Sequence, residues 1–220
     1  GLCTPSQTLT SYQKAIVKAS KKNLPSVELE KLDIDDHNNL SLVSFTKHHY
    51  TTGSRITPYE IWTIQRKALV NWCQNSFNPS AKHLWQLLGM PVVDQSNWHL
   101  IDIKTSHKQA QSTPGGDLEN GVFRPCFSSD AIDERHCTYQ ASSDSNYNLW
   151  LKHKVEGSFT PNGYPWTGLG YTYNWNQEDH QILGPSEFVI APQTPIEIVE
   201  HISIHDFCAR AKAKKRNPKQ

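Results

Sequence analysis

The sequence predicts an α+β fold in which an N-terminal helical hairpin region packs on a mostly antiparallel sheet with aromatic-rich strands. Three observations predict it. Apolar residues recur at helical spacing early in the chain, apolar–polar alternation replaces that spacing further on, and short turns separate the last strands. We expect a single domain over 1–220, with a helical part over about 1–92, a strand-rich part over about 93–208 and a basic tail over 209–220.

The clearest predicted helix begins at Thr57. The tetrapeptide TPYE starting there has the residues of a capping box with proline at the first helical position, and apolar residues then share one face through about residue 75. A shorter helix capped by Ser80 follows and ends at Gly89, so the two helices are expected to form a hairpin. Further helices are predicted over 8–22, 144–156 and 206–213.

Strands are indicated where apolar and polar residues alternate. The predicted strands cover 40–46, 98–104, 122–123, 168–175, 186–191 and 195–204. Turns are expected at Gly184-Pro185 and over 192–195, and a polar, exposed loop over 105–120.

Five cysteines favour export of the chain. Cys126 and Cys137 enclose ten residues of a polar segment, and a disulfide there would contribute roughly 2–3 kcal/mol. Zinc bound with His136 is the competing interpretation, but there is no C-x2-C pair. Cys3 and Cys208 are candidates for a second bridge, which leaves Cys73 as a free thiol on a helix face that looks buried.

Charge and hydropathy exclude two classes of partner. Lys+Arg number 22 against 21 Asp+Glu, for a net charge of +1, so we expect no nucleic acid partner. No apolar run approaches the roughly 18 residues that span a bilayer. The chain begins at Gly1, so a signal peptide or an expression tag is expected to have been removed, and we predict a secreted or periplasmic protein. The basic tail is interpreted as a frayed, solvated end, with contact to an anionic surface as the alternative.

Histidines and aromatic residues are the first candidates for chemistry. The eleven histidines include the pairs His48/His49 and His201/His205 but no HExxH or HxH motif, so no metal site is predicted; a hydrolase using a histidine pair is the alternative. Segment 163–175 holds three aromatic residues on one strand face, and it forms either an aromatic core layer or a ligand cleft. Those three residues are Tyr171, Tyr173 and Trp175, and Trp166 and Trp175 are the candidate ligand-binding residues.

A glutamate heads the apolar strand that starts at Ser186. Glu187 is interpreted as a solvated end residue or as a positioned catalytic group, and the sequence favours the former. Burial would raise its pKa and suit it to catalysis.

The phrases FRPC…C, GYPWTGLGYTYNW and SEFVI, over roughly 57–200, resemble an uncharacterised bacterial exported-protein family. The last two strands are also similar to the closing strands of ADP-ribosyltransferase-type domains, although their Ser-Thr-Ser-type motif is absent. That resemblance implies that Glu187 hydrogen-bonds the nicotinamide ribose of NAD and stabilises an oxocarbenium-like transition state. It also implies that Tyr171 or Tyr173 stacks on nicotinamide and that His99 takes the place of a first-strand His or Arg.

Two functions are therefore expected from different classes. The first is a secreted bacterial binding factor, virulence-associated or host-facing, that takes an unknown host or envelope ligand in an aromatic, Gly-rich cleft without a cofactor. The second is a secreted NAD-consuming or ADP-ribosyltransferase-like enzyme that uses Glu187.

Overall fold

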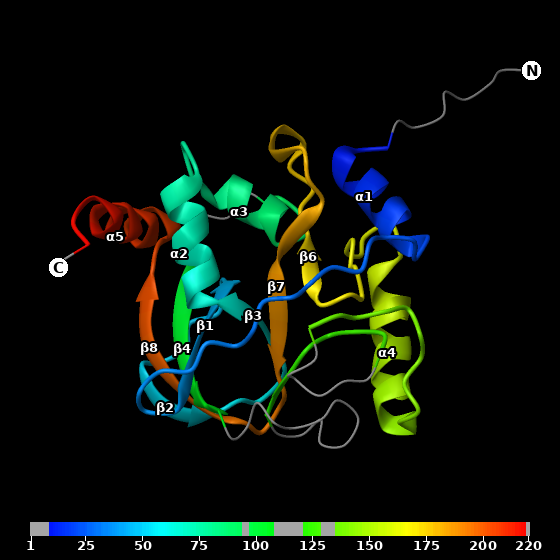
Figure 1. The fold of residues 1–220 in the computed structure, drawn as a ribbon, viewed down its shortest axis with the longest axis horizontal. Helices are drawn as coiled ribbons and strands as arrows, with labels where there is room; N and C mark the ends of the chain where they lie inside the picture. The colour runs from blue at the N-terminus through cyan, green and yellow to red at the C-terminus, as the bar shows by residue number, and fades with distance from the viewer. Residues whose placement is uncertain (1–8, 94–96, 108–120, 129–134, 219–220) are drawn as a thin grey trace, which may run out of the picture.

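The computed structural model describes residues 9–93, 97–107, 121–128 and 135–218, and it confirms the α+β class. Figure 1 shows the elements in place. In chain order they are α1 (Ser11–Ser20), β1 (Asn39–Thr46), β2 (Gly53–Ile56), β3 (Ile61–Gln65), α2 (Arg66–Asn75), α3 (Ala81–Leu87), β4 (His99–Ser106), β5 (Val122–Phe123), α4 (Ser145–Ser158), β6 (Tyr171–Tyr173), η2 (Gln177–Asp179), β7 (Leu183–Ile190), β8 (Pro195–Ile202) and α5 (Ile204–Arg216).

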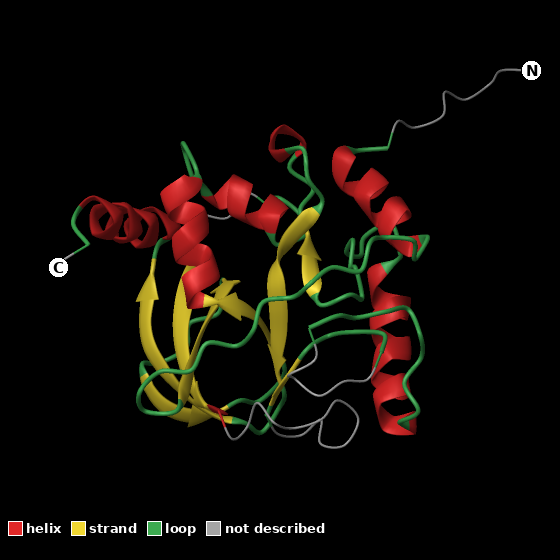
Figure 2. Ribbon diagram, in the orientation of Figure 1, coloured by secondary structure: helices red, strands yellow, loops and turns green. Residues whose placement is uncertain are grey.

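A curved antiparallel sheet organises the fold (Figure 2). Its eight strands run in the order β2-β8-β4-β1-β3-β7-β5, and β6 also pairs with β7. Three of these strands, β1, β2 and β3, lie between residues 39 and 65. The part of the chain over 1–92 was expected to be helical, but it therefore contributes strands as well as helices. Among the described helices, none combines the length and the apolar composition that crossing a bilayer requires.

Each face of the sheet carries its own apolar core, because side chains alternate along every strand. Leu42, Ile101 and Phe188 belong to the core of one face. On the other face Val43 and Leu100 pack with apolar residues of α2, α3 and α5. We call this second face the helix-covered face; the register of β1, β3 and β7 places Glu187 on it.

The prediction of a helix that begins at Thr57 is wrong for the first half of that segment. Residues 61–65 form β3, which pairs with β1 and β7, and α2 begins only at Arg66. The apolar spacing of IWTI fits a helix or a strand, and these β-branched and aromatic residues gain sheet partners on both sides. Thr57 caps no helix: it is buried, and its hydroxyl donates to the Ala191 carbonyl at 2.8 Å.

Several other expectations are settled by the structure. Ser80 caps α3, as predicted, and Asp144 caps α4. Gly184-Pro185 lies inside β7 rather than in a turn, and β6 is shorter than the predicted strand over 168–175. The tail is not frayed from residue 209, because α5 continues to Arg216. Strand β4 extends to Ser106, and the rest of the predicted loop, from residue 108, lies outside the described residues.

Two cysteine pairs are joined as disulfides. The predicted Cys126–Cys137 bridge is confirmed, with 5.9 Å between its Cα atoms. The free thiol predicted at Cys73 is wrong, because Cys73 is bonded to Cys208 across a Cα separation of 4.9 Å. This second bridge ties α2 to α5. Cys3, the partner proposed for Cys208, lies outside the described residues.

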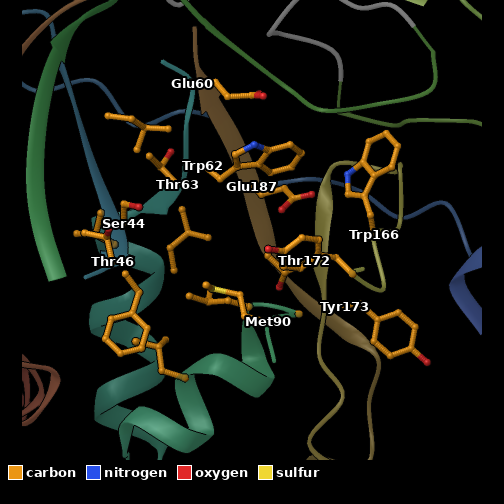
Figure 3. A pocket seen from close by; sticks show the side chains of 18 of the residues that line it. Ser44, Thr46, Glu60, Trp62, Thr63, Met90, Trp166, Thr172, Tyr173 and Glu187 are labelled. Atoms are coloured by element: carbon orange, nitrogen blue, oxygen red, sulfur yellow. The ribbon is translucent and has the colours of Figure 1, made fainter. Parts of the chain in front are cut away.

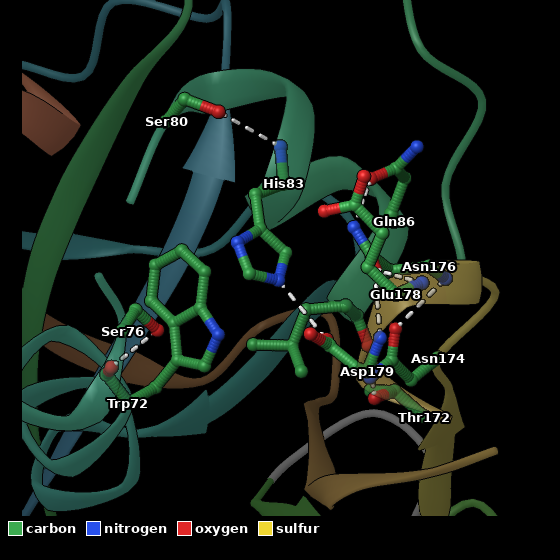
Figure 4. Close-up of polar contacts among 11 residues, drawn as sticks. Trp72, Ser76, Ser80, His83, Gln86, Thr172, Asn174, Asn176, Glu178 and Asp179 are labelled. Atoms are coloured by element: carbon green, nitrogen blue, oxygen red, sulfur yellow. Dashed lines mark hydrogen bonds and ion pairs between the residues drawn. The ribbon is translucent and has the colours of Figure 1, made fainter. Parts of the chain in front are cut away.

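A polar network fixes α3 against the β6–β7 hairpin (Figure 4). His83 on α3 contacts Asp179 at 3.0 Å, and the Asn174 amide donates to the same carboxylate at 2.9 Å. Burial opposes the ionisation of Asp179, but these two hydrogen bonds outweigh it and lower its pKa. Thr172 adds a bond from its hydroxyl to the Leu87 carbonyl at 2.7 Å. The network holds together two walls of the cavity described next.

Candidate functional site

A cavity of about 540 Å³ lies on the helix-covered face of the sheet (Figure 3). Strands β1, β3, β6 and β7 and helices α3 and α4 all contribute to its walls. This volume is typical of sites that enclose a small organic molecule. Its apolar wall includes Val43, Phe45, Ile64, Leu84, Leu88 and Met90.

Glu187 points into this cavity from β7 (Figure 3). Its side chain is 7% exposed, so the interpretation as a solvated strand end is wrong. Burial raises the pKa of Glu187 to about 8, and the Trp166 indole beside it offsets only part of that effect. At neutral pH the cavity therefore contains a carboxylic acid that mostly keeps its proton.

Four buried polar atoms that form no geometric hydrogen bond with another described residue belong to residues that line the same cavity. They are Glu187 Oε1, Glu60 Oε2 and the indole nitrogens of Trp98 and Trp166. Buried polar atoms in native proteins almost always have a hydrogen-bond partner. The Trp166 indole also interacts with the Glu187 carboxyl group, so a bound molecule would meet these two groups side by side, together with the Glu60 acceptor and the Trp98 donor.

The second carboxyl group of the cavity has a different environment from Glu187. Glu60 forms an ion pair with Lys154, whose ammonium group lies 5.4 Å from the centre of the Trp62 ring and 5.5 Å from that of Trp150. The two indoles stack with an interplanar angle of 16°. A carboxyl group paired with lysine and a buried one with a raised pKa therefore line one cavity, which is the kind of asymmetry that separates acid and base roles in enzymes.

The predicted site residues are only partly brought together. Glu187 and Trp166 both line the cavity. Tyr171 and Tyr173 line it too, but their rings pack in a separate apolar cluster near α1, and the Tyr171 hydroxyl donates to the Pro25 carbonyl at 2.8 Å. Figure 3 shows the Tyr173 ring turned away from Glu187. Tyr171 pairs with Ser186 in the ladder, so it faces away from the side on which the neighbouring Glu187 lies.

The other two predicted residues lie away from this cavity. The Trp175 indole donates to the Met90 carbonyl at 2.9 Å, and its ring packs on Tyr12 at 5.2 Å between centroids. His99 is on β4, which β1 and β3 separate from β7, and the strand register places it on the opposite face from Glu187. Of the residues that the ADP-ribosyltransferase resemblance names, Glu187 alone points into the cavity (Figure 3), because the Tyr171 and Tyr173 rings pack elsewhere and His99 lies on the opposite face of the sheet.

Sequence reasoning missed the Glu60, Lys154 and Trp62 part of the site. Glu60 and Trp62 alternate along the chain as they enter β3, which is a strand signal, but the same residues complete a capping-box pattern. Lys154 lies on α4 and meets them only through the tertiary fold.

The chain matches no protein-family model, and neither a curated protein nor a solved structure is significantly similar to it.

Proposed function

We propose that this protein binds a small, uncharged organic molecule in the Glu187 cavity, with the protonated carboxyl group of Glu187 as the polar anchor. One observation carries the proposal: a buried, proton-bearing carboxyl group with an unpartnered oxygen points into an aromatic-lined cavity. A pocket with an apolar wall and a few convergent polar groups is the usual form of a small-molecule site.

The charges of the cavity favour an uncharged ligand. Glu187 is neutral near pH 7, and the charge of Glu60 is balanced by Lys154. The indole faces of Trp62 and Trp166 suit a flat or ring-shaped molecule, while the unpartnered donors and acceptor suit hydroxyl or amide groups. Sugars, nucleosides and nicotinamide share this chemistry.

The proposed setting of this binding is outside the cytoplasm. Both disulfides close within the described part of the chain, and such bonds persist in oxidising compartments. With the resemblance of the sequence to bacterial exported proteins, they support a secreted or periplasmic binding factor that takes a host or envelope molecule.

Ligand-observed NMR with a panel of neutral sugars, nucleosides and nicotinamide tests this proposal. Wild type is expected to bind at least one class of probe. Glu187→Leu should weaken that binding by roughly tenfold or more, because it removes the polar anchor from a buried site. Glu187→Gln should stay within about threefold, since its amide can still donate and accept hydrogen bonds.

Glu156→Gln is the matched control, because it is the same type of substitution at an exposed residue that does not line the cavity. It should leave the affinity unchanged. Binding that Glu187→Leu does not weaken, or a panel in which no probe binds, would show that the cavity is not the site proposed.

A second candidate is the NAD-consuming enzyme that uses Glu187. Lys47, His48 and His153 are exposed and line the same cavity, so the diphosphate of NAD would meet hydrogen-bond donors and positive charge where the cavity opens. Glu187 stabilises an oxocarbenium-like transition state only when it is ionised. This candidate therefore predicts a rate of nicotinamide release that increases with pH through about 8.

Nicotinamide release from NAD, followed at pH 6.5 and pH 9, separates the two candidates. The enzyme should be faster at pH 9, and Glu187→Gln should abolish the release at both values. If wild type releases no nicotinamide at either pH while a probe still binds, the NAD-consuming candidate is excluded and the binding function stands.

A further inference from the structure

Three histidines from distant parts of the sequence meet on the sheet face opposite the Glu187 cavity. His49 follows β1, His99 begins β4 and His201 is near the end of β8. Strands β1, β4 and β8 are neighbours in the sheet, and His99 pairs with Thr46 across the β1–β4 ladder. One ring nitrogen from each histidine lies within 4.8 Å of the others.

Two of the three ring pairs have the spacing of ligands on a shared metal ion, and the third pair is wider. His99 Nε2 and His201 Nδ1 are 3.2 Å apart. Two nitrogens on one tetrahedral zinc at its usual bond length are about 3.3 Å apart, and their ring centres roughly 5 Å apart. The His99 centroid is 5.0 Å from that of His49 and 5.2 Å from that of His201. The third distance, between His49 and His201, is 6.4 Å.

A backbone contact orients the central imidazole for this role. His99 Nδ1 lies 3.1 Å from the Asn97 carbonyl, and a carbonyl can only accept, so Nδ1 carries the hydrogen. The lone pair of the neutral ring is then on Nε2, which faces His201. A second hydrogen bond of this kind, which fixes the tautomer, accompanies nearly all metal-binding histidines.

The cluster also has a route to solvent. His99 is largely buried and held in place, whereas His49 is exposed at the outer side of the group. Three protein nitrogens leave one position of a tetrahedral ion for water or another small ligand. The exposed His49 ring is the ligand that can adjust as an ion enters.

We propose that His49, His99 and His201 form a binding site for Zn²⁺ or a similar divalent transition metal ion, separate from the Glu187 cavity. Neutral imidazoles suit zinc, copper and nickel and discriminate against calcium and magnesium, which prefer oxygen ligands. An ion at this site would join β4 and β8 to the segment that follows β1.

Zinc titration of the full oxidised chain by isothermal calorimetry tests the site. Wild type is expected to bind one Zn²⁺ per chain, and neither Ca²⁺ nor Mg²⁺ should compete. His49→Ala and His201→Ala should each weaken zinc binding by more than about 100-fold, because loss of even an outer hydrogen bond to a ligand costs 10- to 100-fold. His49 is exposed, so this variant keeps the fold even if His201→Ala does not.

His205→Ala is the control, because His205 is exposed on α5 and outside the cluster. It should change the zinc affinity by less than about twofold. Substitution of Co²⁺ for zinc should also give the visible absorption of a tetrahedral ion, and His49→Ala should abolish it. The site is disproved if wild type binds no zinc. It is also disproved if His49→Ala binds zinc with the same affinity as wild type and the His205→Ala control.

Discussion

Replacing Cys73 and Cys208 together by alanine is expected to lower the free energy of unfolding by about 5 kcal/mol. Their bridge spans 135 positions of the chain, and the loop-entropy estimate for a ring of that length gives this magnitude. Both cysteines are buried between α2 and α5, in a core that also includes Leu69 and Phe207. Urea unfolding, followed by tryptophan fluorescence, measures the loss.

The Cys126–Cys137 bridge is the natural comparison within the same molecule. It spans only 11 positions, so the same estimate gives about 3 kcal/mol for its removal. The double substitution at Cys73 and Cys208 should therefore be the more destabilising of the two. If oxidised and fully reduced wild type unfold at the same urea concentration, neither bridge stabilises the folded protein.

The stability of the protein is expected to decrease as the pH rises from about 4.5 to about 8, because of Glu187. Glutamate ordinarily titrates near 4.5, whereas burial raises the pKa of Glu187 to about 8 in the folded protein. Between these values the folded state holds a proton that the unfolded state has lost. The stabilising effect is thus complete below pH 4.5 and is lost as the pH rises through 8, a change of roughly 3–5 kcal/mol.

Glu187→Gln isolates this effect, because the amide cannot ionise and every other titrating group is shared with wild type. The free energy of unfolding of wild type should fall relative to that of Glu187→Gln across this pH range, and the variant should be the more stable protein at pH 8.5. Glu156→Gln should instead follow wild type. Parallel curves for wild type and Glu187→Gln would contradict a buried, protonated Glu187.

Local sequence patterns predicted the elements in which the residue types suit the place that the tertiary fold gives them. Strands β1, β4 and β8 have alternating sequences, and α4 has its Asp144 cap, so each was visible without tertiary information. Residues 61–65 were not, because the same apolar spacing satisfies a helix and a strand, and only pairing with β1 and β7 decides between them.

The site was less predictable than the fold, because it depends on which distant segments meet. Glu187 and Trp166 stood out as a carboxylate on an apolar strand and an aromatic residue in a Gly-rich segment, and both line the cavity. Whether Glu187 is buried depends on the packing of β6 against β7, which no local pattern gives. The same holds for Cys73–Cys208, whose pairing follows from the packing of α2 on α5.

Direct titration of Glu187 shows whether its carboxyl group carries a proton at neutral pH. Carbon-13 labelling of the glutamate side chains gives one carboxyl resonance per glutamate, and the resonance missing from Glu187→Gln identifies Glu187. This resonance is expected to titrate with an apparent pKa of about 8, well above the ordinary range of a glutamate. A Glu187 resonance that titrates near 4.5 would show that the carboxyl group is ionised at neutral pH and would contradict its role as a proton-bearing anchor.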